Sequence, residues 1–178
     1  MPDEELYRPW GTVTPAFWGT GAPEAAAFAE QPPVPAAIRD RMAAVAAAST
    51  AGHPAEAAAL AHRLDTEITA QYGEAHLHTV HIREVRAHLA YLANDHVAAV
   101  GWYLHTARLR AAVQGQDHPD TAQATRRVYS LWRTLPAPDA GRLGAQLLAA
   151  VIDIHGPDAP LVTRIRRRLA SLTTAARA

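Results

Sequence analysis

The heptapeptide Gly115-Gln116-Asp117-His118-Pro119-Asp120-Thr121 occurs in related form at two other places in this chain of 178 residues. One copy starts 42 residues earlier, at Gly73-Glu74-Ala75-His76-Leu77-His78-Thr79, and one starts 41 residues later, at Gly156-Pro157-Asp158-Ala159-Pro160. Self-similarity at a fixed period of about 20 to 50 residues is typical of stacked structural repeats. The sequence therefore predicts a series of similar units, an architecture that usually presents a binding surface and seldom a catalytic pocket.

Each copy has the composition of a turn between two helices. Gly tolerates the left-handed backbone conformation at which helices end, and Asp and Thr can accept hydrogen bonds from the free N–H groups that begin the next helix. A small residue also recurs sixteen positions before each Gly, at Ala57, Ala99 and Ala140. Two closely packed helices require such a residue, because a larger side chain would push their axes apart.

Between these turns the apolar residues recur with the helical period of 3.6. We expect an all-α fold of about seven helices in antiparallel hairpins, since no stretch alternates with the period of a β-strand. Leu92 ends the apolar stripe of the third helix, and Leu135 ends that of the fifth. The expected helices cover about residues 35–48, 54–72, 77–93, 95–113, 119–135, 138–154 and 159–174.

This pattern resembles the tetratricopeptide repeat (TPR) family, specifically the 42-residue variety found in kinesin light chains and in many actinobacterial regulators. The similarity covers about residues 36–173 and lies mainly in the linker at 115–121 and in residues 52–73, with a turn Gly at 52 and the small residue at Ala57. Asn94 stands where the family has Gly, and the third linker has Ala-Pro in place of His-Pro. The resemblance implies a right-handed α-solenoid of about three helix pairs plus a C-terminal capping helix. It also implies a groove lined by the first helix of each pair, and no catalytic residue.

Residues 1–34 differ from the helical domain expected over 35–178. Seven of the thirteen prolines fall within the first 35 positions, and Pro is disfavoured inside helices. The same stretch has five of the eleven aromatic residues, among them Trp10 and Trp18, whereas a disordered tail is poor in aromatics. We predict an N-terminal arm that is mostly non-helical. It either folds back over the first helix or docks, through its aromatic residues, into a partner or the groove.

Arg and Tyr residues are expected on the groove side of two helices. They are Arg83 and Tyr91 on the helix at 77–93, and Arg126, Tyr129 and Arg133 on the helix at 119–135. Both residue types anchor binding energy at protein interfaces, and Arg pairs bidentately with carboxylates. We predict that these residues bind an acidic or C-terminal peptide. The alternative is that they are solvated or pack against the neighbouring repeat.

Bulk composition argues against several functional classes. Seventeen Arg, with no Lys, balance seventeen Asp and Glu, and a chain without net charge lacks the attraction that general binders of nucleic acid or anionic membranes use. The absence of Cys excludes disulfides and thiolate metal sites. No apolar run has the length of a membrane span, and the acidic start Met1-Pro2-Asp3-Glu4-Glu5 is unlike a signal peptide. We expect a cytoplasmic protein.

No catalytic residue, metal site or cofactor is predicted. The chain has ten His, but none has a Glu placed as in the His-Glu-x-x-His zinc motif, and we expect His76 and His118 to make local hydrogen bonds in the turns. Four arginines on the last helix are expected to form the polar outer face of a terminal repeat. The alternatives for them are contact with an acidic partner or with the arm. These arginines are Arg164, Arg166, Arg167 and Arg168.

The sequence as a whole therefore predicts a non-enzymatic adaptor or regulatory protein that binds another protein or peptide through a helical groove. Two alternatives stay open. In the first, the chain is a structural homo-oligomer in which the aromatic arm of one subunit docks on a neighbour. In the second, it is a helical protein with His-dependent metal binding or catalysis.

Overall fold

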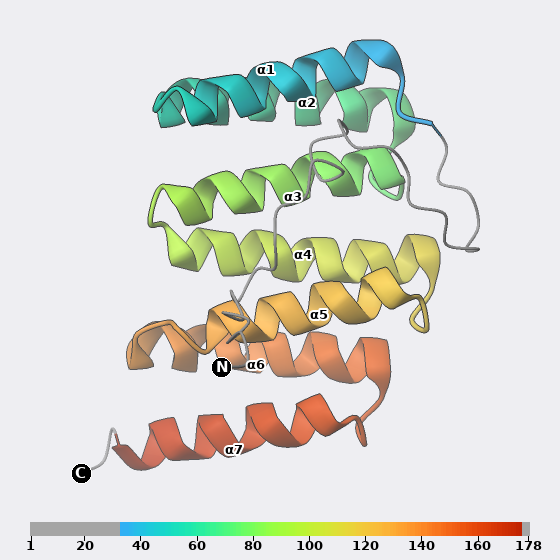
Figure 1. Cartoon of the computed structure of the whole chain (residues 1–178). Helices are drawn as coiled ribbons and strands as arrows, with labels where there is room; N and C mark the ends of the chain where they lie inside the picture. The colour runs from blue at the N-terminus through green and yellow to red at the C-terminus, as the bar shows by residue number, and fades with distance from the viewer. Residues whose placement is uncertain (1–32, 176–178) are drawn as a thin grey trace, which may run out of the picture.

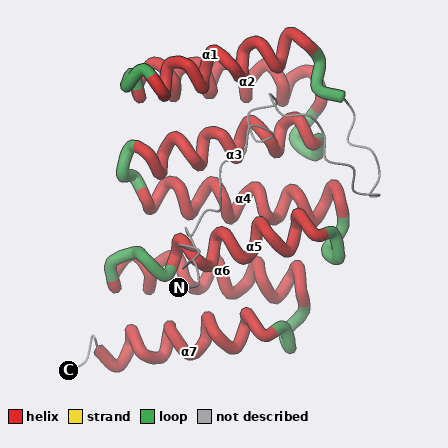
Figure 2. The backbone as a smooth tube through the Cα atoms, viewed as in Figure 1, coloured by secondary structure: helices red, strands yellow, loops and turns green. Residues whose placement is uncertain are grey.

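The computed structural model describes residues 33–175 and has seven α-helices and no strand in that range. Successive helices are joined by short turns and lie antiparallel, one after another, in a layered stack from α1 to α7 (Figures 1 and 2). This confirms the all-α fold, while the right-handed superhelix stays a prediction. The helices are α1 (Ala36–Thr50), α2 (Pro54–Tyr72), α3 (Leu77–Leu92), α4 (His96–Gln114), α5 (Pro119–Trp132), α6 (Ala137–His155) and α7 (Pro160–Ala175).

Each helix packs against the next one along the chain, and α4 also contacts α6. The three recurring small residues, Ala57, Ala99 and Ala140, are 0% exposed, as close helix packing requires. Two apolar clusters hold the stack together, one across α1–α3 and the other from α3 to α7. Helix α3 joins them, because Ile82 belongs to the first cluster and Ala87 to the second.

The turns after α2, α4 and α6 share one backbone conformation. Gly73, Gly115 and Gly156 have φ values of 85°, 94° and 82°, a region that side chains with a Cβ rarely occupy. Asn94 follows α3 at φ 61°, and Gly52 has φ 79° in the turn after α1, 42 residues earlier. Asn is among the few other residues that tolerate a positive φ. The turn at Asn94 repeats the hydrogen bonds of the turn at Gly52, since each N–H donates to the carbonyl three residues back and the next N–H to the carbonyl five residues back.

Two expectations were wrong, one about a helix end and one about an apolar residue. Helix α5 ends at Trp132 and not near 135: the N–H groups of Thr134 and Leu135 donate to carbonyls three residues back, at 3.0 and 3.2 Å. Pro136 explains this, because a residue that precedes Pro is disfavoured in the helical conformation. Leu92, expected in the apolar stripe of α3, is 51% exposed and is the last residue of that helix.

The arm predicted for residues 1–34 falls almost wholly outside the described residues, and so do Trp10 and Trp18. Residues 33–35 precede α1 without regular secondary structure. Within 33–175, none of the helices combines the length and the apolar character needed to cross a membrane.

Helix α7 packs against α6 at Gly144, where there is no room for a side chain. A Cβ at this position would lie 2.4 Å from Leu169 Cδ2 and 3.0 Å from Trp132 Cζ2. Trp132 cannot easily move away, because it is fully buried and its Nε1 donates to the Ala140 carbonyl at 2.8 Å. Gly144 therefore lets α7 approach the stack.

We predict that Gly144→Ala lowers the free energy of unfolding by about 1–2 kcal/mol, because overpacking outweighs the gain in helix propensity. Gly141→Ala is the matched control: it lies on the same helix, and a Cβ there meets nothing within 4 Å. The control should raise the stability by up to about 1 kcal/mol. Urea unfolding of both variants tests this, and equal effects would contradict the packing role of Gly144.

Candidate partner-binding site

The linker histidines and threonines organise the turns that set the start of α3 and α5. His76 Nδ1 accepts from the His78 N–H at 3.1 Å, and His118 Nδ1 accepts from the Asp120 N–H at the same distance. Thr79 Oγ1 donates to the Gly73 carbonyl at 2.6 Å. Thr121 Oγ1 likewise donates to the Gly115 carbonyl at 2.9 Å. The prediction of local hydrogen bonds for His76 and His118 is confirmed.

Arg83 is only 8% exposed and lies at the centre of a polar network between α2, α3 and α4. Its Nε pairs with Asp65 Oδ1 at 3.2 Å, and its Nη1 lies 2.7 Å from His105 Nε2. Its Nη2 reaches Glu74 Oε1 at 3.3 Å. These contacts give Arg83 a role inside the fold, and direct contact with a partner stays a prediction for it.

Tyr91 lies near the C-terminal end of α3 and is half-buried. Its ring meets the His96 ring edge-on, with centroids 5.0 Å apart, and burial raises the pKa of its hydroxyl. Tyr91 therefore packs its ring beside the start of α4 while part of the side chain stays accessible.

The three α5 residues predicted to bind a partner are brought together. Arg126 and Arg133 are exposed, and Tyr129 between them is half-buried. The Arg133 guanidinium lies 5.8 Å from the centre of the Tyr129 ring, within reach of a cation–π interaction. The Tyr129 ring in turn lies 6.0 Å from that of Trp132. Helix α5 and the residue that follows it thus present two accessible cations beside aromatic side chains.

Helix α7 adds to this surface through Arg168, which was not among the predicted binding residues. Its guanidinium lies 5.5 Å from the centre of the Trp132 ring, and its Nη2 donates to the Arg133 carbonyl at 2.9 Å. Arg168 therefore ties α7 to the C-terminal end of α5. It was expected on a polar outer face, but a sequence gives no sign of which of four neighbouring arginines turns inward.

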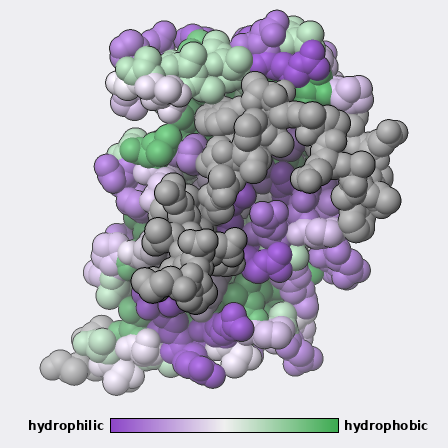
Figure 3. All heavy atoms as spheres, in the orientation of Figure 1, coloured by the Kyte–Doolittle hydropathy of each residue, from purple (hydrophilic) through white to green (hydrophobic). Residues whose placement is uncertain are grey.

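Counting from the turn glycines shows which arginines of α5 and α7 occupy equivalent repeat positions. Arg126 lies eleven residues after Gly115, and Arg167 lies eleven after Gly156. Arg164, about one turn before Arg167, lies eight residues after Gly156 and corresponds to Gln123 on α5. Both α7 residues are exposed, and hydrophilic residues gather over α7 in the lower part of Figure 3. We name Arg126, Arg133, Arg164 and Arg167 the α5–α7 arginine surface.

Arginines outnumber acids in the part of the sequence that forms α5, α6 and α7. Over residues 119–175 the chain has eight Arg and four Asp. None of the four surface arginines has an ion pair with an acid among residues 33–175, whereas Arg41 pairs with Glu67 and Arg142 with Asp139 in the same range. The surface therefore offers positive charge that the described part of the fold does not neutralise.

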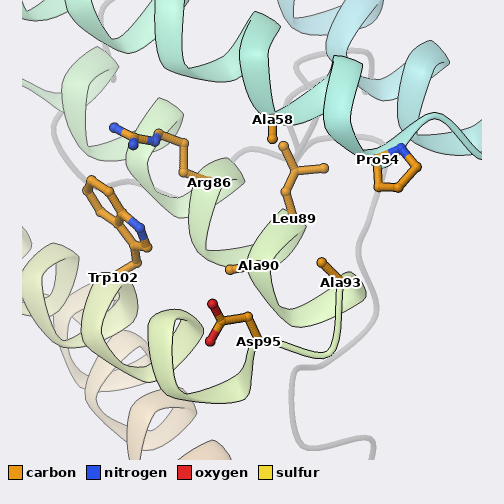
Figure 4. A pocket seen from close by; sticks show the side chains of 8 residues that line it. All are labelled: Pro54, Ala58, Arg86, Leu89, Ala90, Ala93, Asp95 and Trp102. Carbon is orange, nitrogen blue, oxygen red and sulfur yellow. The ribbon is translucent and has the colours of Figure 1, made fainter.

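A second feature is a hollow of about 230 Å³ where α2, α3 and α4 meet (Figure 4). Its wall holds Arg86 over the Trp102 ring, 4.0 Å from the ring centre. Both charged residues of the wall are already engaged: Arg86 pairs with Asp65, and Asp95 accepts from the Ala98 N–H at 2.9 Å. The hollow is lined by Pro54, Ala58, Arg86, Leu89, Ala90, Ala93, Asp95 and Trp102.

The remaining strong electrostatic feature is structural. Arg110 on α4 makes a bidentate pair with Glu84 on α3, at 2.7 and 2.8 Å, and also reaches Asp120 on α5 at 3.2 Å. Burial alone would lower the pKa of Arg110, but its hydrogen bonds to Glu84 and the negative charges of Glu84 and Asp120 outweigh burial and raise it. Arg110 and its two carboxylate partners thus link α3, α4 and α5.

Within residues 33–175 no three His, Asp or Glu side chains are grouped as metal ligands would be. A scan against protein-family models finds no match for the chain, and a search of the curated proteins finds none either. The similarity to TPR proteins therefore stays a prediction, which rests on the linkers, the turn glycines and the small residues.

We predict that Glu84→Gln lowers the unfolding free energy by about 3 kcal/mol, since it leaves a buried Arg with less compensation. Arg110→Met should be similarly costly. The double variant should lose less than the two single losses together, by about 1–3 kcal/mol. As a control, Asp139→Asn at the exposed Arg142 pair should change stability by no more than about 0.5 kcal/mol. Urea unfolding measures these stabilities. If the loss in the double variant equals the sum of the two single losses, the coupling between Glu84 and Arg110 is contradicted.

We also predict that stability falls as the pH is lowered from 7.5 to 5.5. Burial lowers the pKa of five histidines below the ordinary 6.5, so between the folded and unfolded pKa values the unfolded chain binds more protons. The stabilisation is complete above about pH 6.5 and is lost below it. The five are His78, His81, His88, His105 and His155.

Urea unfolding at pH 7.5, 6.5 and 5.5 measures this dependence. His105→Gln should reduce its slope, because an amide oxygen can accept from Arg83 without titrating. Equal or greater stability at pH 5.5 would contradict the prediction.

Proposed function

We propose that the chain is a non-enzymatic adaptor or regulatory domain of TPR type, which binds an acidic segment of another protein. The observation that carries the proposal is the α5–α7 arginine surface: four accessible arginines without carboxylate partners in the described fold. Arg forms bidentate, charge-assisted hydrogen bonds with carboxylates, so an Asp- or Glu-containing segment is the complementary ligand.

Aromatic residues beside the arginines supply a second component of binding. Tyr129 is half-buried next to Arg133, and Trp132 lies behind it against Arg168. Interfaces concentrate their binding energy in Arg, Tyr and Trp, with exposed charges mainly steering the encounter. We therefore assign recognition to Arg126, Tyr129 and Arg133, extended by Arg164 and Arg167. We give Arg83 a supporting role through its buried ion pairs.

An adaptor role also fits the placement of this face on regular helices. The surface residues lie on helices whose starts are set by the turn glycines, and α7 is held to α5 by the hydrogen bond from Arg168 to the Arg133 carbonyl. A preformed surface loses little conformational entropy on binding. We assign no reaction to it, because recognition by arginine and aromatic side chains needs none.

We predict that a fluorescein-labelled twelve-residue Glu-rich peptide binds the full chain and that Arg126→Glu/Arg133→Glu weakens binding at least about tenfold. Fluorescence anisotropy at 100 mM NaCl measures the affinity. The control is Arg63→Glu/Arg108→Glu, which makes the same net-charge change at two exposed positions on α2 and α4 and should leave the affinity within about twofold.

Two results would overturn the proposal. One is equal loss of binding in the two double variants, which would mean that only net charge matters. The other is equal affinity for a Lys-rich peptide of the same length, since an arginine surface should repel it.

A further inference from the structure

The neutral chain is built from parts of opposite charge. Residues 1–32 contain five acids and one Arg, namely Asp3, Glu4, Glu5, Glu24, Glu30 and Arg8. Residues 119–175 contain eight Arg and four Asp, and residues 33–118 are close to balanced, with seven Arg and eight Asp or Glu. The acidic excess at one end therefore equals the basic excess of the described part of the last third, four charges in each case.

The basic excess is accessible. Arg126 on α5 and Arg133 directly after it are exposed, and so are Arg164 and Arg167 on α7. No acid within residues 33–175 forms an ion pair with any of them, although exposed arginines elsewhere in that range, such as Arg41, do have one. The described fold thus leaves a positive surface for which the same chain carries a matching negative segment.

The acidic segment is long enough to reach this surface from its attachment point. It joins the fold just before Ala36, where α1 starts. Packed helices lie about 8–10 Å apart. The six spacings between the seven helices therefore place α7 at most about 60 Å from α1. A chain of 32 residues spans roughly 100 Å when extended. The segment is therefore long enough to contact α5 and α7.

We propose that residues 1–32 dock on the α5–α7 arginine surface of their own chain and cover it. This inference rests on the proposed function for its consequence, since an acidic partner would then have to displace the segment before binding. Tethering favours the chain's own surface, because two groups joined by one chain meet at an effective concentration of the order of millimolar. A second copy at micromolar concentration cannot compete. Trp10 and Trp18 supply aromatic faces on which arginines can stack.

The absence of Cys makes a direct test simple. Thr14→Cys in the segment and Ala170→Cys, exposed on α7, allow a donor and an acceptor dye to be placed on the full chain. We expect efficient energy transfer at 50 mM NaCl and a clear decrease at 500 mM, because salt screens exposed charge pairs. Transfer should persist when the labelled chain is diluted into excess unlabelled chain.

Charge reversal makes the test specific. Arg164→Glu/Arg167→Glu should lower the docking equilibrium constant by about tenfold, and Glu24→Arg/Glu30→Arg added to it should restore most of the transfer. Arg63→Glu/Arg108→Glu, with the same change in net charge, should leave the transfer unchanged. Unchanged transfer in the α7 variant, or equal loss in the control, would overturn the proposal. Loss of transfer on dilution into unlabelled chain would assign the contact to a second copy and overturn docking within one chain.

The acidic peptide separates this inference from the proposed function. A full chain with the five acids of the segment neutralised (Asp→Asn, Glu→Gln) should bind the Glu-rich peptide several-fold more tightly than the native chain, because nothing competes. If charge reversal leaves the energy transfer unchanged while peptide binding still depends on Arg126 and Arg133, only the docking proposal fails. If the peptide also fails to bind, the proposed function fails with it.

Discussion

The left-handed glycine at the end of every second helix is the constraint on which the rest of the structure depends. Gly73 and Gly115 end α2 and α4 at positive φ, and in each case a Thr six residues later donates to the Gly carbonyl while a His side chain caps the next helix. The turn is thus fixed on both sides. Because α3 and α5 start in the same geometry, the small residues at 57, 99 and 140 can repeat the same close contact.

This regular backbone lets equivalent positions carry different chemistry. Eleven residues after the turn glycine, α3 has Glu84, α5 has Arg126 and α7 has Arg167. Glu84 is buried and paired with Arg110, whereas the two arginines are exposed. A buried charge is tolerated only with a partner, while an exposed one can stay available to ligands. The stack therefore changes from internal pairing at α3 to an accessible basic surface at α5 and α7.

The helices could be predicted because their signals are local. Apolar periodicity, the turn glycines and the small residues fix where α2, α3 and α4 lie to within about two residues. Prediction failed where long-range packing decides the outcome. Nothing near Arg83 in the sequence shows that Asp65 and His105 surround it, and nothing near Gly144 shows that Trp132 and Leu169 fill the space beside it. The accessibility of the predicted site residues was anticipated only in part: Arg126 and Arg133 are exposed, whereas Arg83 is buried, and whether these residues bind a partner stays a prediction.

The zero net charge therefore says less about binding than it first suggests. Charges act over a Debye length, about 10 Å at 0.1 M salt, which is close to the spacing of neighbouring helices. A ligand at α5 and α7 responds to the arginines there and hardly to acids on α1 or α2. Overall neutrality still removes the long-range attraction on which general nucleic-acid binders rely. It leaves selectivity to the local pattern, and a segment of matching charge on the same chain can then compete for the surface without changing the charge of the whole.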